Sequence, residues 1–150
     1  AQVKAAFEAL QSRLADLTPV FQDIGEEMLN RTRDRFRSQT APDGSPWAAL
    51  SPDYKKHKEK NQDKILTLSG NLRGLLNVQA GPRSVRIGTP LEYGATHQFG
   101  AKQGAFGRTR RGGPIPWGDI PARPFLGLST SDEQELLDIL RDHLQRALSP

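Results

Sequence analysis

The chain has 150 residues, of which 35% are hydrophobic and 25% are charged, and it contains no cysteine. This length fits one domain with one core, and the low hydrophobic content leaves little apolar surface for a deep substrate cavity. The missing cysteine excludes disulfides, thiolate zinc sites and a cysteine nucleophile. The formal net charge of +4 makes the chain mildly basic, and no apolar run approaches the roughly 18 residues of a membrane span.

A pair of amphipathic helices is predicted in residues 1–39. Apolar residues recur every three or four positions from Val3 to about Leu17, which places them on one helical face. Thr18 and Pro19 are an N-cap and first-turn signal for a second helix that runs to about Ser38. Its later half carries four arginines, which we interpret as a solvated face that complements the helix dipole rather than as a phosphate site. They are Arg31, Arg33, Arg35 and Arg37.

Residues 40–52 form a loop with several turn signals, and a short helix follows. Trp47 within this loop is either a plug for a small core or an anchor for a partner, and we favour the plug. Ser51 and Pro52 predict the start of a helix that includes the basic cluster of residues 54–58. We expect that cluster to be solvated.

A β-hairpin is the clearest strand signal. Val78 and Ala80 alternate with polar residues, a turn follows at residues 81–84, and Val85 and Ile87 alternate again. Ahead of the hairpin, residues 65–68 form a possible strand, and Ser69 is a plausible N-cap for a helix that runs to about residue 76.

The C-terminal half is predicted to contain a helix over residues 91–99, a loop, an extended segment and a last helix. Gly100 would end the first of these helices. Residues 120–126 contain two prolines, which belong to an edge strand or a strand end. The last helix runs from about Asp132 to Leu148, with caps offered by residues 129–131.

Residues 101–119 form a basic loop that we expect to be mobile. No acidic residue lies between Glu92 and Asp119, and glycine is frequent. Glycine gives mobility and arginine gives charge, so the loop could fold onto phosphates or an acidic protein surface, or it could be a surface loop without a partner. Only Phe106 and Trp117 are available for base stacking. The candidate interaction residues are Lys102, Arg108, Arg110 and Arg111.

No catalytic, metal-binding or cofactor-binding residues are predicted. The three histidines, His57, His97 and His143, lack the four-residue spacing of a helical zinc site. The chain has no G-x-S-x-G elbow, no P-loop and no G-x-G-x-x-G.

Four motifs together form a recognisable series. They are PDGSPWAALSP at residues 42–52, LTLSGNLR at residues 66–73, YGATHQFG at residues 93–100 and IPARPFLG at residues 120–127. In this order and spacing the chain resembles the phage virion morphogenesis (tail completion) family of Mu-like phages over nearly its whole length. The last three motifs are also similar, more distantly, to those of neck and tail-completion proteins of long-tailed phages. Ser69 replaces a threonine of that pattern and Gly94 precedes Ala95, and neither change should disturb a cap or a short helix.

The resemblance implies a structural, non-enzymatic virion protein with a small α+β fold, in which an antiparallel sheet is flanked by N-terminal and C-terminal amphipathic helices. It implies a single domain that forms a ring homo-oligomer, a hexamer in its expected form. The ring would bind tail-tube and head-connector proteins, and its lumen would pass DNA without sequence preference. The expected place is the tail or neck of the virion, after assembly in the bacterial host cytoplasm, with no role for a membrane.

Within that picture we expect residues 120–126 to pack against the helix of residues 93–99 inside the subunit, and the basic loop to line the lumen or grip a neighbouring ring. The candidate structural or intersubunit residues are Trp47, Tyr93, His97, Phe99, Arg123 and Phe125. The runner-up hypothesis is a nucleic-acid-binding module that uses the basic loop. A small hydrolase or nuclease is a third class, which lacks any motif.

Overall fold

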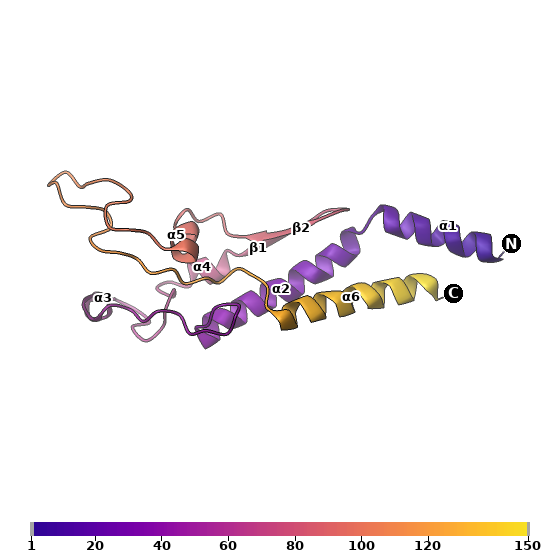
Figure 1. Ribbon diagram of the computed structural model, residues 1–150, viewed down its shortest axis with the longest axis horizontal. Helices are drawn as coiled ribbons and strands as arrows, with labels where there is room; N and C mark the ends of the chain where they lie inside the picture. Colours follow the sequence, from indigo (N-terminus) through magenta and orange to yellow (C-terminus); the bar gives the residue numbers. More distant parts are fainter. Residues whose placement is uncertain (1, 150) are drawn as a thin grey trace. The chain divides into compact units, whose positions relative to one another are not determined.

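A computed structural model describes residues 2–149, which contain six helices and one two-stranded antiparallel sheet (Figure 1). The predicted α+β class is therefore confirmed. Within this part of the chain, no helix is both long and apolar enough to span a bilayer. In chain order the elements are α1 (Gln2–Ala15), α2 (Thr18–Ser38), α3 (Pro52–His57), α4 (Asn71–Gly74), β1 (Asn77–Ala80), β2 (Val85–Gly88), α5 (Tyr93–Phe99) and α6 (Thr130–Leu148).

The contacts divide the chain into two compact units. The first unit contains the chain up to Arg31, the hairpin segment Asn77–Gly88 and the chain from Leu128 onward. The second unit contains Thr32–Leu76 and Thr89–Gly127. Helix α2 contributes residues to both. That the chain is a single domain stays a prediction.

In the first unit, an ion-pair cluster joins α2 to α6. The Arg31 guanidinium binds Glu27 on its own helix at 2.6 Å, and it reaches Asp132 at 3.1 Å and Glu135 at 3.4 Å on α6. The hydrogen bond to Glu27 is the largest of the influences that raise the pKa of Arg31. Because one partly buried cation is shared by three carboxylates, the cluster fixes α6 against α2 more firmly than an isolated surface pair would.

The hairpin of the first unit packs against α2 at Gly25. Its register pairs Val78 with Ile87 and Ala80 with Val85. Gly25 is buried, and a Cβ atom there would lie 2.3 Å from Val78 Cγ1 and 2.9 Å from Val85 Cγ2. A side chain at this position would therefore push the hairpin away from the helix.

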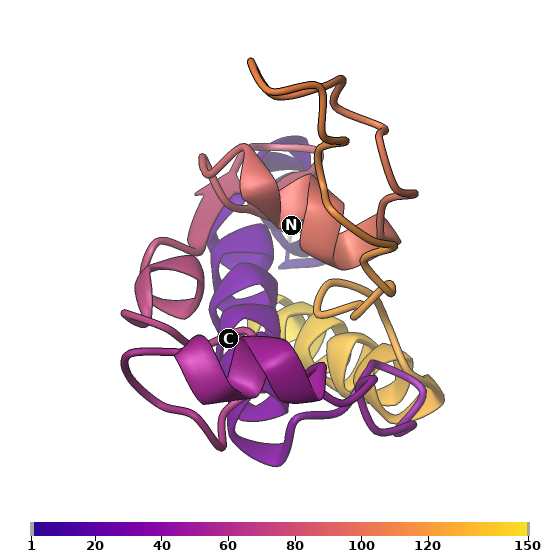
Figure 2. The same cartoon turned by 90° about the vertical axis from the view of Figure 1, so that its left-hand side faces the viewer.

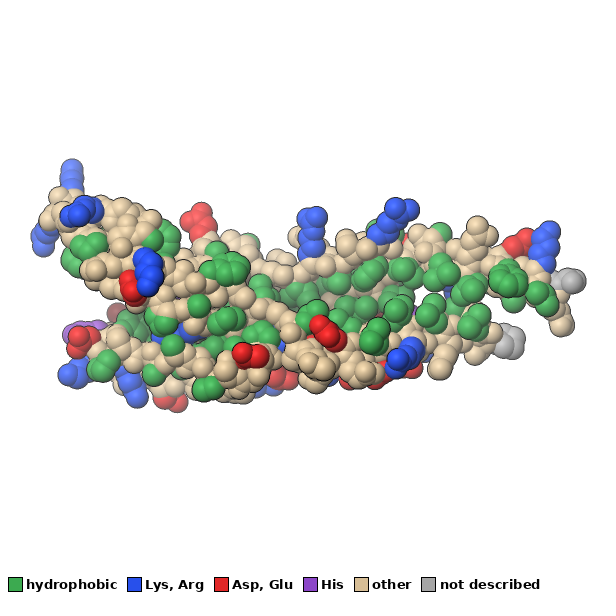
Figure 3. Space-filling view, viewed as in Figure 1, with side chains coloured by type: hydrophobic (Ala, Val, Ile, Leu, Met, Phe, Trp, Pro, Cys, Tyr) green, Lys and Arg blue, Asp and Glu red, His purple; other side chains and the backbone are tan. Residues whose placement is uncertain are grey.

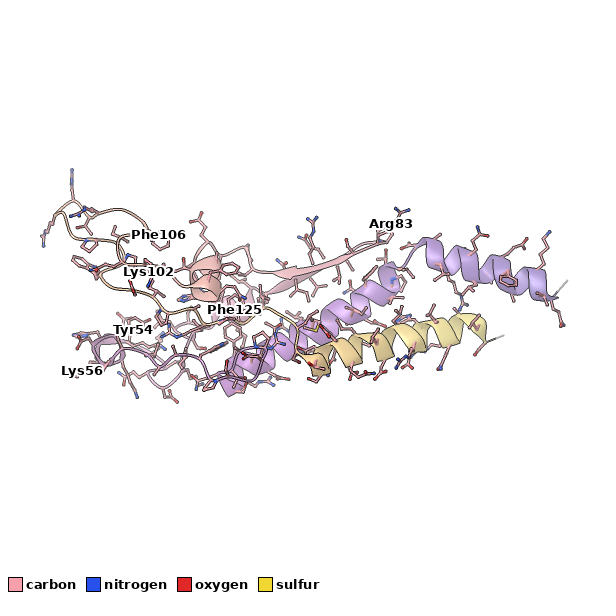
Figure 4. The ribbon with its side chains drawn as sticks, viewed as in Figure 1. Tyr54, Lys56, Arg83, Lys102, Phe106 and Phe125 are labelled. Atoms are coloured by element: carbon pink, nitrogen blue, oxygen red, sulfur yellow. The ribbon has the colours of Figure 1, made fainter. Side chains whose placement is uncertain are left out.

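The core of the second unit is built around three aromatic rings. Phe36 contacts Trp47 with ring centroids 5.3 Å apart and Phe125 at 5.5 Å, and all three side chains are buried. Figure 4 marks Phe125 beneath α5. The structure thus buries Trp47 as a core residue, and its indole Nε1 donates to the Pro124 carbonyl at 2.7 Å.

The arginines of α2 are not uniformly solvated. Arg35 is buried and donates from Nη1 to the carbonyls of Phe125 at 3.1 Å and Gly127 at 2.9 Å. Our prediction of a solvated face was wrong for Arg35, because the helical period turns one arginine of the run toward the chain that follows α5.

Three further local predictions differ from the structure. Residues 65–68 form turns rather than a strand, with Leu66 at a φ of +55°. Helix α4 begins after Gly70 and has no side-chain cap, so Ser69 does not cap it. Residues 120–126 are extended, but only Ile120 makes a bridge, to Ala101. The two prolines of that segment lack the N–H groups that would continue a ladder.

Candidate interaction surface

The extended segment after the loop is held against α5 by a side-chain amide. Gln98 Oε1 accepts hydrogen bonds from the backbone N–H groups of Phe125 and Leu126, each at 3.0 Å, and its Nε2 donates to the Leu126 carbonyl at 2.9 Å. The Arg123 N–H donates to the His97 carbonyl at 2.7 Å. The expected packing of this segment against α5 is therefore present. Sequence reasoning missed Gln98, although an amide is the side chain that can replace a missing strand partner.

Arg123 connects this segment to the loop that carries Trp47. Its guanidinium donates to the carbonyls of Ala48 at 2.7 Å and Ala49 at 2.9 Å, and the side chain is only 6% exposed. Burial lowers the pKa of Arg123 from its usual value. The residue holds two stretches of backbone together and places a positive charge inside the second unit.

His97 lies beside Arg123 and is partly buried. Its Nδ1 atom is shielded from solvent and has no hydrogen-bond partner within the described chain, and its ring meets Tyr93 edge-on at 5.9 Å. Burial is the main cause that lowers the pKa of His97, and the nearby charge of Arg123 lowers it further. The imidazole is therefore neutral at pH 7.

These residues line an open groove of about 750 Å³ in the second unit. Its walls come from α3, the segment of residues 66–72, α5 and the segment of residues 116–121. Lys58 also lines the groove and is only 4% exposed, so our prediction of a solvated cluster at residues 54–58 was wrong for this residue. Its ammonium group donates to the carbonyls of Asn61 and Lys64, which draw it inward.

The basic loop has regular internal hydrogen bonds and projects beyond α5 (Figures 1 and 2). Thr109 N donates to the Gly113 carbonyl at 2.7 Å, and Ile115 N donates to the Gly107 carbonyl at 2.8 Å. At the base, Asp119 accepts from the Lys102 ammonium at 3.1 Å. These bonds give the loop the form of a small hairpin. Its mobility stays a prediction.

The arginines of this loop lie at its outer end, where Figure 3 shows a group of blue side chains. Arg108, Arg110 and Arg111 are all exposed. Arg108 donates to the Gly112 carbonyl at 3.1 Å, whereas Arg110 and Arg111 make no hydrogen bond or ion pair within residues 2–149. Two guanidinium groups are therefore available to a partner.

The candidate residues all lie in the second unit but do not form one site. The core group contains Trp47 and Phe125, and the groove group contains Tyr93, His97 and Arg123. Phe99 is 78% exposed and belongs to neither. Lys102 lies at the base of the loop (Figure 4) and the arginines at its tip, so the four basic candidates do not form one cluster. Across residues 2–149, no three His, Asp or Glu side chains gather as a metal ion would require.

The phage virion morphogenesis family matches residues 1–145. The chain belongs to this family. The resemblance carried by the four motifs is thereby confirmed, and no solved structure matches the chain.

Relatives of the chain include proteins of phage Mu, of a Mu-like prophage and of phage P2. The G protein of Escherichia phage Mu, which is named for capsid assembly, is 34% identical over 125 residues, covering 81% of this chain and 75% of that protein. The FluMu G protein 2 of a Mu-like prophage in Haemophilus influenzae is 28% identical, covering 96% of this chain and 90% of that protein. The tail completion protein S of Escherichia phage P2 is 26% identical, covering 93% of this chain and 98% of that protein.

Proposed function

We propose that this chain is a non-enzymatic structural subunit of a phage virion that completes the tail and joins it to the head. It would act as a ring homo-oligomer, a hexamer in its expected form, at the neck or tail terminus. The support is family membership over nearly the whole chain and the similarity to a protein named for tail completion. Its partners would be tail-tube and head-connector proteins, with DNA passing through the lumen.

The observation that carries this proposal at the level of residues is the basic loop. Its base is fixed by Asp119, and its tip presents Arg110 and Arg111 without partners in the described chain. A rigid base with a charged tip suits a contact with an anionic surface, which here is the DNA in the lumen or an adjoining ring.

The experiment replaces Arg108, Arg110 and Arg111 together by alanine in the phage. We expect the protein to fold normally, because all three side chains are exposed, and we expect infectious titre to fall by about tenfold or more from lost partner contacts. The matched control replaces the exposed Lys55, Lys56 and Lys60 by alanine, which removes the same charge from the same unit. Normal titres for the arginine variant, or equal losses for both variants, would contradict the assigned role of the loop.

A second candidate function, a nucleic-acid-binding module, rests on the same free guanidinium groups. The purified protein would then bind duplex DNA with an affinity that falls steeply with salt, and the triple arginine variant would lose both the affinity and the salt slope. Binding that persists in the variant would remove this candidate.

A further inference from the structure

The two units carry opposite formal charge. The first unit has seven Lys and Arg against ten Asp and Glu, whereas the second has fourteen against seven. The net charge of +4 therefore conceals an acidic unit and a strongly basic one. A chain with two oppositely charged surfaces attracts a second copy of itself, acidic surface to basic surface.

The groove of the second unit is lined by two cations, Lys58 and Arg123, and by one carboxylate, Asp119, which pairs with Lys102 at 3.1 Å. Lys58 and Arg123 are both more than nine-tenths buried, and neither has a carboxylate within ion-pair distance in residues 2–149. Buried charges normally have such a partner. The Lys58 ammonium uses two of its three donors and the Arg123 guanidinium two of its five, so donors remain for an anionic group.

The walls of the groove are apolar and partly exposed. Tyr54 is 50% exposed, Leu68 48% and Tyr93 44%, and all three line it. A fitting occupant therefore presents apolar side chains next to carboxylates. Phosphate alone would leave these walls uncovered.

Helix α6 of the first unit has a face of this composition. Glu133, Leu137 and Asp138 are all exposed. Glu133 and Leu137 are neighbours on the helix surface because they are four residues apart, and Asp138 lies about a quarter turn further round. Asp138 pairs with Arg141 at 2.8 Å, and an exposed pair of this kind is weak enough to exchange for another cation. Leu137 is 48% exposed, whereas Leu136, Leu140 and Leu144 of the same helix are partly buried. Leu148 in the last turn is exposed as well.

We infer that the groove of one copy receives the Glu133–Leu137–Asp138 face of α6 from a second copy. The inference rests on the proposed ring and deepens it by naming the two surfaces in contact. Because the groove and the helix face are different surfaces, the contact is head-to-tail, and repeated contacts close into a ring or continue as a chain.

The test uses two variants of the full chain that each lack one surface. Tyr54→Glu/Leu68→Glu places carboxylates in the groove, and Glu133→Lys/Asp138→Lys reverses the charge of the helix face. These side chains are all substantially exposed, so both variants should fold, which circular dichroism verifies. Should the first double variant unfold, Tyr54→Glu alone replaces it.

Light scattering after size exclusion measures the mass of each sample over a range of concentrations. We expect the wild-type chain to self-associate and each variant alone to do so at least about tenfold more weakly. The decisive sample is an equimolar mixture, which should regain association, because each pair keeps one intact groove and one intact helix face and the changed surfaces also carry opposite charges.

Two matched controls keep the wild-type behaviour. Leu75→Glu/Phe106→Glu adds the same charge at exposed apolar positions of the second unit outside the groove, and Glu8→Lys/Glu26→Lys reverses two exposed carboxylates of the first unit outside α6. Variants with the wild-type mass, controls that fail equally, or a mixture that does not pair would each overturn the contact.

Two further outcomes separate this inference from the proposed function. A wild-type chain that stays monomeric in solution but restores infectivity overturns the contact and leaves the tail role standing, since the ring would then form only on the tail. Groove variants that self-associate normally but lose infectivity point to another occupant, and they also overturn the contact with a second copy.

Discussion

Gly100 has a backbone conformation and a close contact that other residues do not tolerate. Its φ is +76°, and an added Cβ would lie 2.7 Å from the Ile120 carbonyl oxygen and 2.8 Å from Ala122 N. The sequence predicted a helix terminator here, and the structure adds that the following segment passes directly over it. The residue therefore both ends α5 and allows the extended segment to approach.

Gly100→Ala should lower the free energy of unfolding by about 2 kcal/mol or more, because backbone strain and a clash with backbone atoms act together. Gly107→Ala is the matched control. Its φ is +92°, but no atom lies within 4 Å of the added Cβ, so only the strain remains. Chemical denaturation measures both, and equal losses would show that the close approach is relieved at no cost.

The partly buried side chain of His97 should make the free energy of unfolding depend on pH. Burial lowers its pKa in the folded chain below the unfolded value of about 6.5. As the pH falls below about 6.5, the unfolded chain therefore binds more protons than the folded one, and the stability present at higher pH is progressively lost.

His97→Gln should remove part of this loss, so the variant's free energy of unfolding should fall less than that of the wild type between pH 7.5 and pH 5. Urea titrations at the two pH values measure it. His57→Gln, at an exposed position on α3, controls for the loss of an imidazole elsewhere. A variant that follows the wild-type pH slope would show that buried His97 contributes nothing to acid sensitivity.

At the scale of elements, helix α6 begins at a capping box. The sequence indicated residues 129–131 as candidate caps, and the structure assigns the role to Ser129. Ser129 Oγ accepts from the Asp132 N–H at 3.1 Å, and Asp132 Oδ2 accepts from the Ser129 N–H at 2.7 Å. The Asp132 carboxylate also forms an ion pair with Arg31 of α2 at 3.1 Å. One carboxylate thus caps its own helix and joins it to another.

Ser129→Ala should lower the free energy of unfolding by about 1 kcal/mol, since it leaves a first-turn N–H without its partner. Ser131→Ala, two residues further along and exposed, should change it by less than about 0.5 kcal/mol. Thermal or chemical unfolding of both variants checks the difference. Comparable losses would mean that the box adds nothing beyond ordinary first-turn polarity.

Helix α1 shows an amphipathic pattern that its contacts with α6 cover only in part. None of its described residues is buried, and Val3 and Phe7 remain 70% and 68% exposed. In Figure 3 the apolar side chains of α1 gather with those of α6. A helix of this length is marginal in water without packing, so α1 depends on the contacts of its apolar face.

At the scale of the whole molecule, the sequence shows the net charge and the acid-free stretch between Glu92 and Asp119, but not the division into two oppositely charged units. Outside that stretch the acidic and basic residues are interspersed, and the division follows only from which segments come together. Residues 77–88 and the C-terminal helix join the N-terminal helices across a long sequence separation. Local patterns carry no information on such contacts, because periodicity specifies a face and not its partner.

The sequence by itself determined the family, the helices with strong period and caps, and the hairpin, since these depend on neighbours within a few residues. Only the tertiary structure decided that Lys58, Arg35 and Arg123 are buried and that Gln98 holds the extended segment. From the sequence alone, long cationic side chains are expected at the surface. Their burial here depends on backbone carbonyls, such as those of Ala48 and Phe125, that the fold brings from distant parts of the chain.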